Sequence, residues 1–305
     1  MITIIITSYN EPKATKKAVE TFLKQSKSKD LKVIVVDPFP EVEEFLRKEI
    51  SDKRFDFIPD PGEGKSFALN MLFEMLYSDN KNDLIIFTDG DVYVSDNALK
   101  EIINTFKDEK IGCITGQPVA IDSPDTKYGF WAKVLFKGVD KVRNRLSKEG
   151  EFFQTSGYLF AIRNSIVKEI PEDVPEDCII PYLVWKAGYK IGYVPEAKVF
   201  IKYPDNWKDW LNQRIRVIKA HENISKIAPD MPRTKSFFNE IKEGLFFTLK
   251  QPRNLKQAYW LLQLYFARLY IYYRSFKEMH SKKVFNPAWR DNPVESSKME
   301  DKIDG

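Results

Sequence analysis

The stretch that decides the fold is LIIFTDGD, residues 84–91. Its first part, Leu84–Thr88, is an apolar run without polar alternation, which is typical of a strand buried on both faces. Three other short runs have the same character and precede segments with helical spacing: Ile2–Thr7, Lys32–Asp37 and Phe55–Ile58. Strands that alternate with helices in this way predict a parallel sheet covered by helices.

The remaining elements complete an α/β prediction, in which a mixed half follows the parallel half. Helical spacing is found at Thr15–Gln25, Glu41–Ile50, Ser66–Tyr77 and Asn97–Phe106. In the second half we expect strands at Ile111–Gln117, Gly157–Ile162 and Tyr189–Phe200, and helices at Lys127–Leu146, Asp177–Ala187 and Trp207–Asn223. Residues 235–279 predict one or two helices rich in aromatic side chains.

The composition bounds the class of protein. Of 305 residues, 43% are hydrophobic and 30% charged, which allows a large core and excludes a disordered chain. Two cysteines, Cys113 and Cys178, exclude a disulfide framework and indicate a reducing compartment. The N-terminal apolar run lacks the basic flank of a signal peptide, and no long uninterrupted apolar window occurs, so we expect a cytoplasmic protein.

Acidic residues follow the buried strand directly. In open parallel sheets the ligand lies beyond the carboxyl ends of the strands, and Thr7–Glu11, Asp37 and the loop 59–65 occupy such places. Asp89 and Asp91, separated by one glycine, are suited to a hard divalent cation, which prefers oxygen ligands. The alternative is an ordinary turn after a strand, where Asp and Gly are common.

Residues 62–66, GEGKS, open a predicted helix and are similar to a P-loop. Lys65 and the free amides of a helix start suit a phosphate group. Pro59, however, stands where the first glycine of that signature belongs. Because the rest of the motif is present, a P-loop-like nucleotide-binding NTPase is kept as the alternative function. A second alternative is that residues 62–66 are an ordinary helix N-terminus with no role in binding.

Two polar segments lie in the second half. Glu176 and Asp177 precede a helix, where they either complement the helix dipole or supply a carboxylate base for a hydroxyl acceptor. Gln213, Arg214 and Arg216 lie on a predicted helix, with the first and last on one face. Arginine holds a diphosphate well through its planar guanidinium, and the alternative is a solvated basic face.

Taken in order over residues 1–222, these motifs resemble the family 2 glycosyltransferases of the GT-A fold. IIITSYNEP resembles the family's strand ending in T-x-Y-N-E, GKSFALN its GKA-x-ALN, and FTDGD its metal-binding D-x-D. TSGYLFAIRNS resembles the acceptor-side segment, and PEDCIIPYLVWKAGYKIGYVPEAKVF resembles the stretch that begins with the catalytic Glu-Asp. VVDPFP and QRIRV depart from VVDDGS and Q-x-x-R-W at Pro38 and Val217.

On the donor side, the resemblance implies a nucleotide-sugar, with a UDP-hexose as the first candidate. Asp37 would bind the base, and Lys65 would lie near the nucleotide sugar. The nucleoside pocket would be lined by Thr7, Tyr9 and Glu11. Mg²⁺ or Mn²⁺ would be held against the diphosphate by Asp89 and Asp91.

On the acceptor side, the resemblance implies that Asp177 is the general base of an inverting transfer to a hydroxyl group, because one base and direct attack invert the anomeric carbon. The other acceptor-side residues would be Gly157, Arg163 and Glu176. The diphosphate and the acceptor would be steadied by Gln213, Arg214 and Arg216.

The resemblance, which ends at residue 222, and the composition of the residues after it predict the domain organisation. Residues 1–222 would form the catalytic domain, divided into a nucleotide-binding half, 1–117, and an acceptor half, 118–222. Residues 223–285 would form C-terminal aromatic and basic helices, and residues 286–305 a polar tail.

The C-terminal segment concentrates positive charge. Between Lys250 and Arg290 there are nine basic residues and one acid, Glu278, in a chain whose net charge is +4. A helix with this composition and interleaved aromatics suits an anionic membrane interface, so a lipid-linked or glycan acceptor and a peripheral position at the cytoplasmic membrane face are hypotheses. The alternative is a helix that packs its aromatics on the catalytic domain.

Two further function classes are not favoured. The basic segment alone does not indicate a nucleic-acid-binding module, because cation attraction to phosphates is independent of sequence, and we expect no nucleic-acid partner. A non-catalytic relative that only binds a sugar nucleotide is disfavoured by the intact set of acidic residues.

Overall fold

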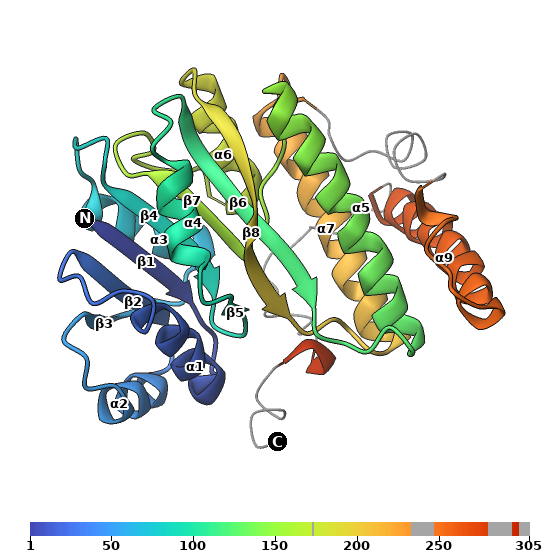
Figure 1. Cartoon of the computed structure of the whole chain (residues 1–305), viewed down its shortest axis with the longest axis horizontal. Helices are drawn as coiled ribbons and strands as arrows, with labels where there is room; N and C mark the ends of the chain where they lie inside the picture. The colour runs from blue at the N-terminus through green and yellow to red at the C-terminus, as the bar shows by residue number, and fades with distance from the viewer. Residues whose placement is uncertain (173, 233–246, 280–294, 299–305) are drawn as a thin grey trace. The chain divides into compact units, whose positions relative to one another are not determined.

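The computed structural model describes residues 1–172, 174–232, 247–279 and 295–298, which belong to two compact units (Figure 1). Unit 1 contains the described residues of 1–118 and 146–201. Unit 2 contains those of 119–145 and 202–298. The boundaries predicted at residues 117 and 222 divide the chain by its resemblance to a family and not by compactness. They stay a prediction.

Unit 1 is built on an eight-stranded sheet in the order β3-β2-β1-β4-β7-β6-β8-β5. The strands are β1 (Ile2–Thr7), β2 (Leu31–Asp37), β3 (Phe55–Pro59), β4 (Leu84–Asp89), β5 (Tyr93–Val94), β6 (Ile111–Ala120), β7 (Leu159–Arg163) and β8 (Lys190–Ile201). β3, β2, β1 and β4 are parallel neighbours, whereas β7 runs antiparallel to β4 and β6, and β5 to β8. The parallel half followed by a mixed half confirms the predicted α/β class.

The helices of unit 1 flank this sheet. They are α1 (Pro12–Leu23), α2 (Pro40–Glu49), α3 (Lys65–Leu76), α4 (Ala98–Thr105) and α6 (Glu176–Lys186), and α5 (Lys127–Glu149) ends in this unit. The centre of β1, Ile4–Ile6, is fully buried, and so are Ile85 and Ile86 of β4. Burial of each such side chain stabilises the fold by about 1.5–3 kcal/mol, and burial on both faces explains why these strands show no alternation.

Backbone chemistry fixes where the functional helices begin. Gly64 caps α3 with φ +114°, a conformation that L side chains rarely adopt, so glycine is required there. Pro175 precedes α6, whose first two residues are Glu176 and Asp177. These starts place Lys65 and the two acids in first helical turns.

Unit 2 is helical. It contains the first part of α5, together with α7 (Trp207–Ile227), α9 (Leu255–Met279) and the 3₁₀ turn η2 (Glu295–Ser297). Its core is aromatic, and the polar tips of two buried rings are satisfied: Trp131 Nε1 donates to the Trp260 carbonyl at 2.7 Å, and Trp210 Nε1 to Tyr203 Oη at 3.0 Å. None of the helices in the described ranges combines the length and hydropathy that a bilayer crossing needs.

The predicted elements are found with ends shifted by a few residues, and β5 is an addition. Of the aromatic-rich region 235–279, α9 covers Leu255–Met279, while residues 235–246 lie outside the described residues. The expected tail, 286–305, is described only at 295–298.

Candidate active site

The carboxyl ends of the parallel strands bring the first acids together. In the strand register Thr7 stands opposite both Val36 and Asp89. Thr7 Oγ1 donates to Asp89 Oδ1 at 3.1 Å. Asp37, one residue beyond Val36, ends the neighbouring strand. The edge of the sheet that the sequence singled out is therefore lined by polar side chains.

Asp37 is a buried and oriented carboxylate. Its Oδ1 accepts from the Phe39 amide at 2.9 Å and its Oδ2 from the Asn10 amide at 3.0 Å. Burial raises the pKa of Asp37, and the two amides partly oppose that rise. An ionised carboxylate has about four acceptor positions, so it retains capacity for the N–H groups of a ligand.

The loop between β1 and α1 carries the other predicted nucleoside residues. Asn10, at φ 55°, lies in the left-handed region that asparagine tolerates better than most residues, and this turn aims its amide at Asp37. Tyr9 packs edge-on against Phe39, with ring centroids 5.0 Å apart. Glu11 is buried and precedes α1. Tyr9 and Glu11 thus flank the residue whose amide holds Asp37.

Lys65 bridges two elements of the site. Its Nζ lies 3.0 Å from Asp89 Oδ1 and 2.5 Å from Glu176 Oε1. Burial alone would lower the pKa of Lys65, but the two carboxylates together raise it above its ordinary value. The ammonium group therefore stays charged and ties the end of β4 to the start of α6.

The two acids of α6 face Gly157. Asp177 Oδ2 accepts from the Gly157 amide at 3.3 Å, and the Asp177 carbonyl accepts from the amide and hydroxyl of Thr155 at 3.1 and 2.8 Å. A Cβ placed on Gly157 would lie 3.8 Å from both Asp177 Oδ2 and Glu176 Oε1. Gly157, Glu176 and Asp177, predicted to share the acceptor side, are therefore in contact.

The donor set of Asp89 and Asp91 fits a divalent cation. Burial raises the pKa of Asp91, and the negative charge of Asp89 raises it further, so the two carboxylates are close enough to repel each other. A hard cation relieves such repulsion. Among the described residues no group of three or more His, Cys, Asp or Glu is arranged to hold a metal. Phosphate or water oxygens would complete the coordination, as is usual for Mg²⁺.

Arg163 is not brought to this cluster. It pairs with Leu84 at the beginning of β4, the opposite end of that strand from Asp89. Its guanidinium is buried and donates to backbone carbonyls at 2.7–3.1 Å. The four carbonyls belong to Lys81, Phe106, Asp108 and Ile111. The geometry gives Arg163 a structural task, and its acceptor-side role stays a prediction without geometric support.

The three predicted residues of α7 belong to unit 2. Gln213 is buried, and its Oε1 accepts from Arg214 Nη2 at 2.8 Å. The Arg214 guanidinium also lies 5.3 Å from the centroid of the Tyr203 ring. Gln213 and Arg216 share a helix face, as their spacing predicted. Their approach to the donor stays a prediction.

Sequence reasoning missed the groups that orient these acids. Thr155 and the Asn10 amide act on acids distant in sequence, so no local spacing could reveal them. The Lys65–Glu176 pair was also missed, although both residues were singled out separately. The one available signal was the asparagine after Tyr9, because asparagine is enriched at positive φ.

Comparison with known proteins gives one family. The family model described as "Glycosyltransferase like family 2" matches residues 1–220. A relative named probable glycosyltransferase YdaM, from Bacillus subtilis, is 26% identical over 243 residues, which cover 73% of this chain and 56% of that protein. An N-acetylglucosaminyltransferase of Rhizobium meliloti is 25% identical over 238 residues, 70% of this chain and 54% of that protein.

A poly-beta-1,6-N-acetyl-D-glucosamine synthase of Staphylococcus aureus is 23% identical over 245 residues, 77% of this chain and 58% of the synthase. The chain thus spans a little over half the length of these curated relatives. The family model covers more than two thirds of the chain and includes all the acidic residues of the site described above. The resemblance first seen in the motifs is confirmed: the chain belongs to the glycosyltransferase-like family 2.

Proposed function

We propose that the protein is a metal-dependent, inverting glycosyltransferase, which moves a sugar from a nucleotide-sugar to a hydroxyl acceptor. One observation carries the proposal: the Asp89–Lys65–Glu176 linkage joins the strand end of the D-x-D motif to the helix that begins with Asp177. Donor-side and acceptor-side groups of unit 1 are thereby parts of one network.

The donor-side residues bind and orient. The two nearest to the diphosphate would be Asp89 and Asp91, which would hold Mg²⁺ or Mn²⁺; the bound cation supplies Lewis-acid neutralisation of the leaving group. Lys65 is a fixed positive charge beside Asp89 and can donate to a phosphate oxygen. Asp37, with acceptor capacity to spare, would take an N–H of the base.

Asp177 would move the proton. The Gly157 amide holds its Oδ2, so the carboxylate can receive the proton of the acceptor hydroxyl. The acceptor oxygen then attacks the anomeric carbon as the bond to the diphosphate oxygen breaks, and the electron pair leaves with the diphosphate. A single displacement of this kind inverts the anomeric carbon. Glu176 is less suited to be the base, because the Lys65 ammonium lies on its Oε1.

The donor class is testable directly. Relatives named for N-acetylglucosamine support a UDP-hexose, with UDP-N-acetylglucosamine tested first. Thermal shift against a panel of sugar nucleotides should give a stabilising hit that requires Mn²⁺ or Mg²⁺, and Asp91→Ala should lose the metal requirement together with the shift. The NTPase alternative predicts different results. The Asp91→Ala protein would hydrolyse ATP, and the wild type would not bind sugar nucleotides.

For the acceptor we propose a glycan or a lipid-linked saccharide, met at an anionic membrane surface with the protein peripheral on its cytoplasmic face. Support comes from α9, whose apolar side chains are 50–90% exposed at spacings of three or four residues: Leu255, Tyr259, Leu262, Phe266, Leu269 and Tyr273. Residues 247–279 carry six basic residues and one acid. An apolar stripe flanked by basic residues is the pattern of a helix that lies in a membrane interface.

A further inference from the structure

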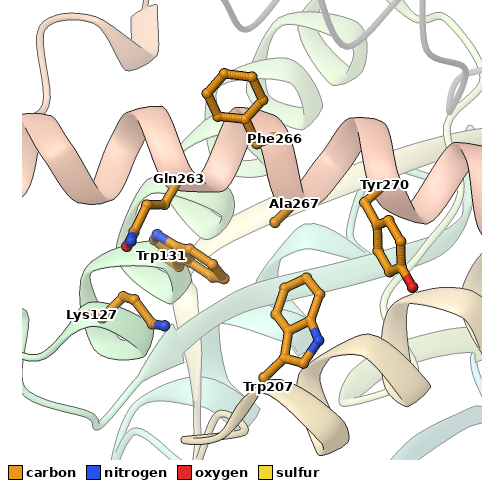
Figure 2. Close-up of a pocket in the computed structure, with 7 residues that line it drawn as sticks. All are labelled: Lys127, Trp131, Trp207, Gln263, Phe266, Ala267 and Tyr270. Carbon is orange, nitrogen blue, oxygen red and sulfur yellow. The ribbon is translucent and has the colours of Figure 1, made fainter.

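Unit 2 contains a cavity of about 330 Å³ that the proposed chemistry does not use (Figure 2). Helices α5, α7 and α9 line it. Four of the lining side chains are aromatic: Trp131, Trp207, Phe266 and Tyr270. Small-molecule sites start at about 300 Å³ and are usually apolar or aromatic with a few polar groups. This cavity has that size and that character.

Trp207 is a partly exposed aromatic side chain of this lining. Trp207 stacks on the fully buried Trp210, with ring centroids 5.5 Å apart and an interplanar angle of 21°. Trp207 is still 40% exposed, and Figure 2 shows its ring directed toward Ala267, another lining residue. The lining therefore offers partly exposed aromatic surface together with one small residue, Ala267.

The same geometry disfavours a stacked nucleobase. A base held between two rings needs them about 7 Å apart and parallel, twice the contact distance of carbon atoms. Trp207 and Tyr270 have centroids 6.0 Å apart and are tilted by 38°, so they contact each other instead of forming a slot. Partly exposed aromatic surface without a slot suits a ligand with one apolar side, such as the C–H face of a pyranose ring.

Two polar side chains complete the lining. Gln263 Oε1 is buried and accepts no hydrogen bond from the described part of the chain. The Lys127 ammonium lies 4.5 Å from the centroid of the Tyr128 ring and 5.4 Å from that of the Trp131 ring, and an ammonium group can donate to hydroxyl oxygens. No lining residue is acidic. An amide and an ammonium group match the hydroxyl edge of a sugar, and the ammonium group repels a cationic ligand.

We propose that this pocket binds one hexopyranosyl unit of the acceptor glycan. The apolar ring face lies on Trp207, and hydroxyl groups meet Gln263 and Lys127. The inference rests on the proposed function, which makes a saccharide the expected ligand, and it deepens that function by naming the acceptor class: an oligosaccharide that binds through a sugar recognised in unit 2.

Calorimetric titration of the full chain tests the pocket. Three tetrasaccharides are the probes, and each is built from one β-linked sugar: N-acetylglucosamine, glucose or galactose. Binding of one of them should weaken about tenfold or more in Trp207→Ala, because a stacking face is lost, and less than about threefold in Trp207→Phe, which keeps a ring. Tyr259→Ala, a matched control at an exposed aromatic of α9 outside the cavity, should bind as the wild type does.

A second variant and a second ligand separate the possible failures. Gln263→Leu keeps the shape and removes the amide, so it should weaken saccharide binding without lowering the melting temperature. UDP with Mn²⁺ is titrated into the same proteins. The pocket is refuted if no tetrasaccharide binds the wild type, or if Trp207→Ala and Gln263→Leu bind as the wild type does, even where UDP binding is intact. Saccharide binding that depends on Trp207 in a protein that never binds UDP supports the pocket and refutes the proposed donor chemistry.

Discussion

Replacing Asp177 by asparagine separates chemistry from folding at the proposed base. Asparagine keeps the shape of the side chain, and its amide oxygen can still accept from the Gly157 amide, now at 3.3 Å from Asp177 Oδ2. The contacts of Thr155 are made to the backbone carbonyl of Asp177 and are unaffected by the change. We therefore expect Asp177→Asn to fold, with a free energy of unfolding lowered by less than about 1 kcal/mol.

The catalytic loss should be far larger. General-base assistance is typically worth about 10²–10⁴-fold, which corresponds to about 3–5 kcal/mol of activation free energy. The amide of asparagine cannot take the acceptor's proton, so kcat should fall in that range while donor binding stays unchanged. Steady-state kinetics with saturating sugar nucleotide, calorimetric titration of UDP with Mn²⁺, and a thermal melt measure the three quantities.

Glu176→Gln is the matched control, one residue away on the same helix. Because Lys65 lies 2.5 Å from Glu176 Oε1, this change should alter the position of Lys65 and hence donor affinity, with a smaller effect on kcat than Asp177→Asn. A kcat for Asp177→Asn within tenfold of the wild type would refute Asp177 as the base. So would a larger loss of kcat in Glu176→Gln.

Three other changes test the framework. Arg163→Met should lower the free energy of unfolding by about 2–4 kcal/mol in urea melts, because it removes a buried guanidinium and leaves four backbone carbonyls, that of Phe106 buried, without this donor; a change below about 0.5 kcal/mol would contradict the structural task assigned to it. Leu262→Glu, at a residue of the exposed stripe that does not line the pocket, should abolish flotation with anionic vesicles, whereas Met75→Glu, at a similarly exposed apolar residue of unit 1, should not; equal flotation of both would remove the membrane proposal. The raised pKa of Asp37 means that the folded state holds this proton more tightly than the unfolded state, so its contribution to stability falls as pH rises from about 3.8 through the folded-state pKa. In urea melts across that pH range, the free energy of unfolding of Asp37→Asn should therefore fall less with pH than that of the wild type. A steeper fall in the variant would contradict the raised pKa of Asp37.

The buried strands could be predicted because a strand buried on both faces shows no alternation of apolar and polar residues in its own sequence. Every residue of Ile2–Thr7 is β-branched, so the end of this strand, and the edge carrying the acids, could be placed to within a residue. β5 could not be predicted, because its two residues, Tyr93 and Val94, form a strand by pairing with Phe200 and Val199, more than one hundred positions away. Two residues are too few to show any periodicity.

The candidate site was predictable in its acids and less so in their surroundings. The D-x-D pair and Glu176-Asp177 are visible as sequence motifs, but their partners are chosen by tertiary contacts, such as Thr155 on Asp177 across 22 positions. For Arg163 the structure shows contacts with backbone carbonyls, while its predicted acceptor-side role stays a prediction. A motif gave it a place near the acceptor, whereas the antiparallel pairing of β7 with β4 sends it to the far end of the sheet, and strand direction is not encoded in a five-residue apolar run.

The position of Lys65 has a consequence for the order of binding. Its ammonium group is a built-in counter-ion that balances Asp89 and Glu176 before any substrate arrives. A divalent ion that enters alone must compete with this resident charge for Asp89. A nucleotide diphosphate changes the balance, since its oxygens give the displaced ammonium group a new partner and the metal additional ligands. Metal and donor should therefore occupy the site as a single unit, each strengthening the hold of the other.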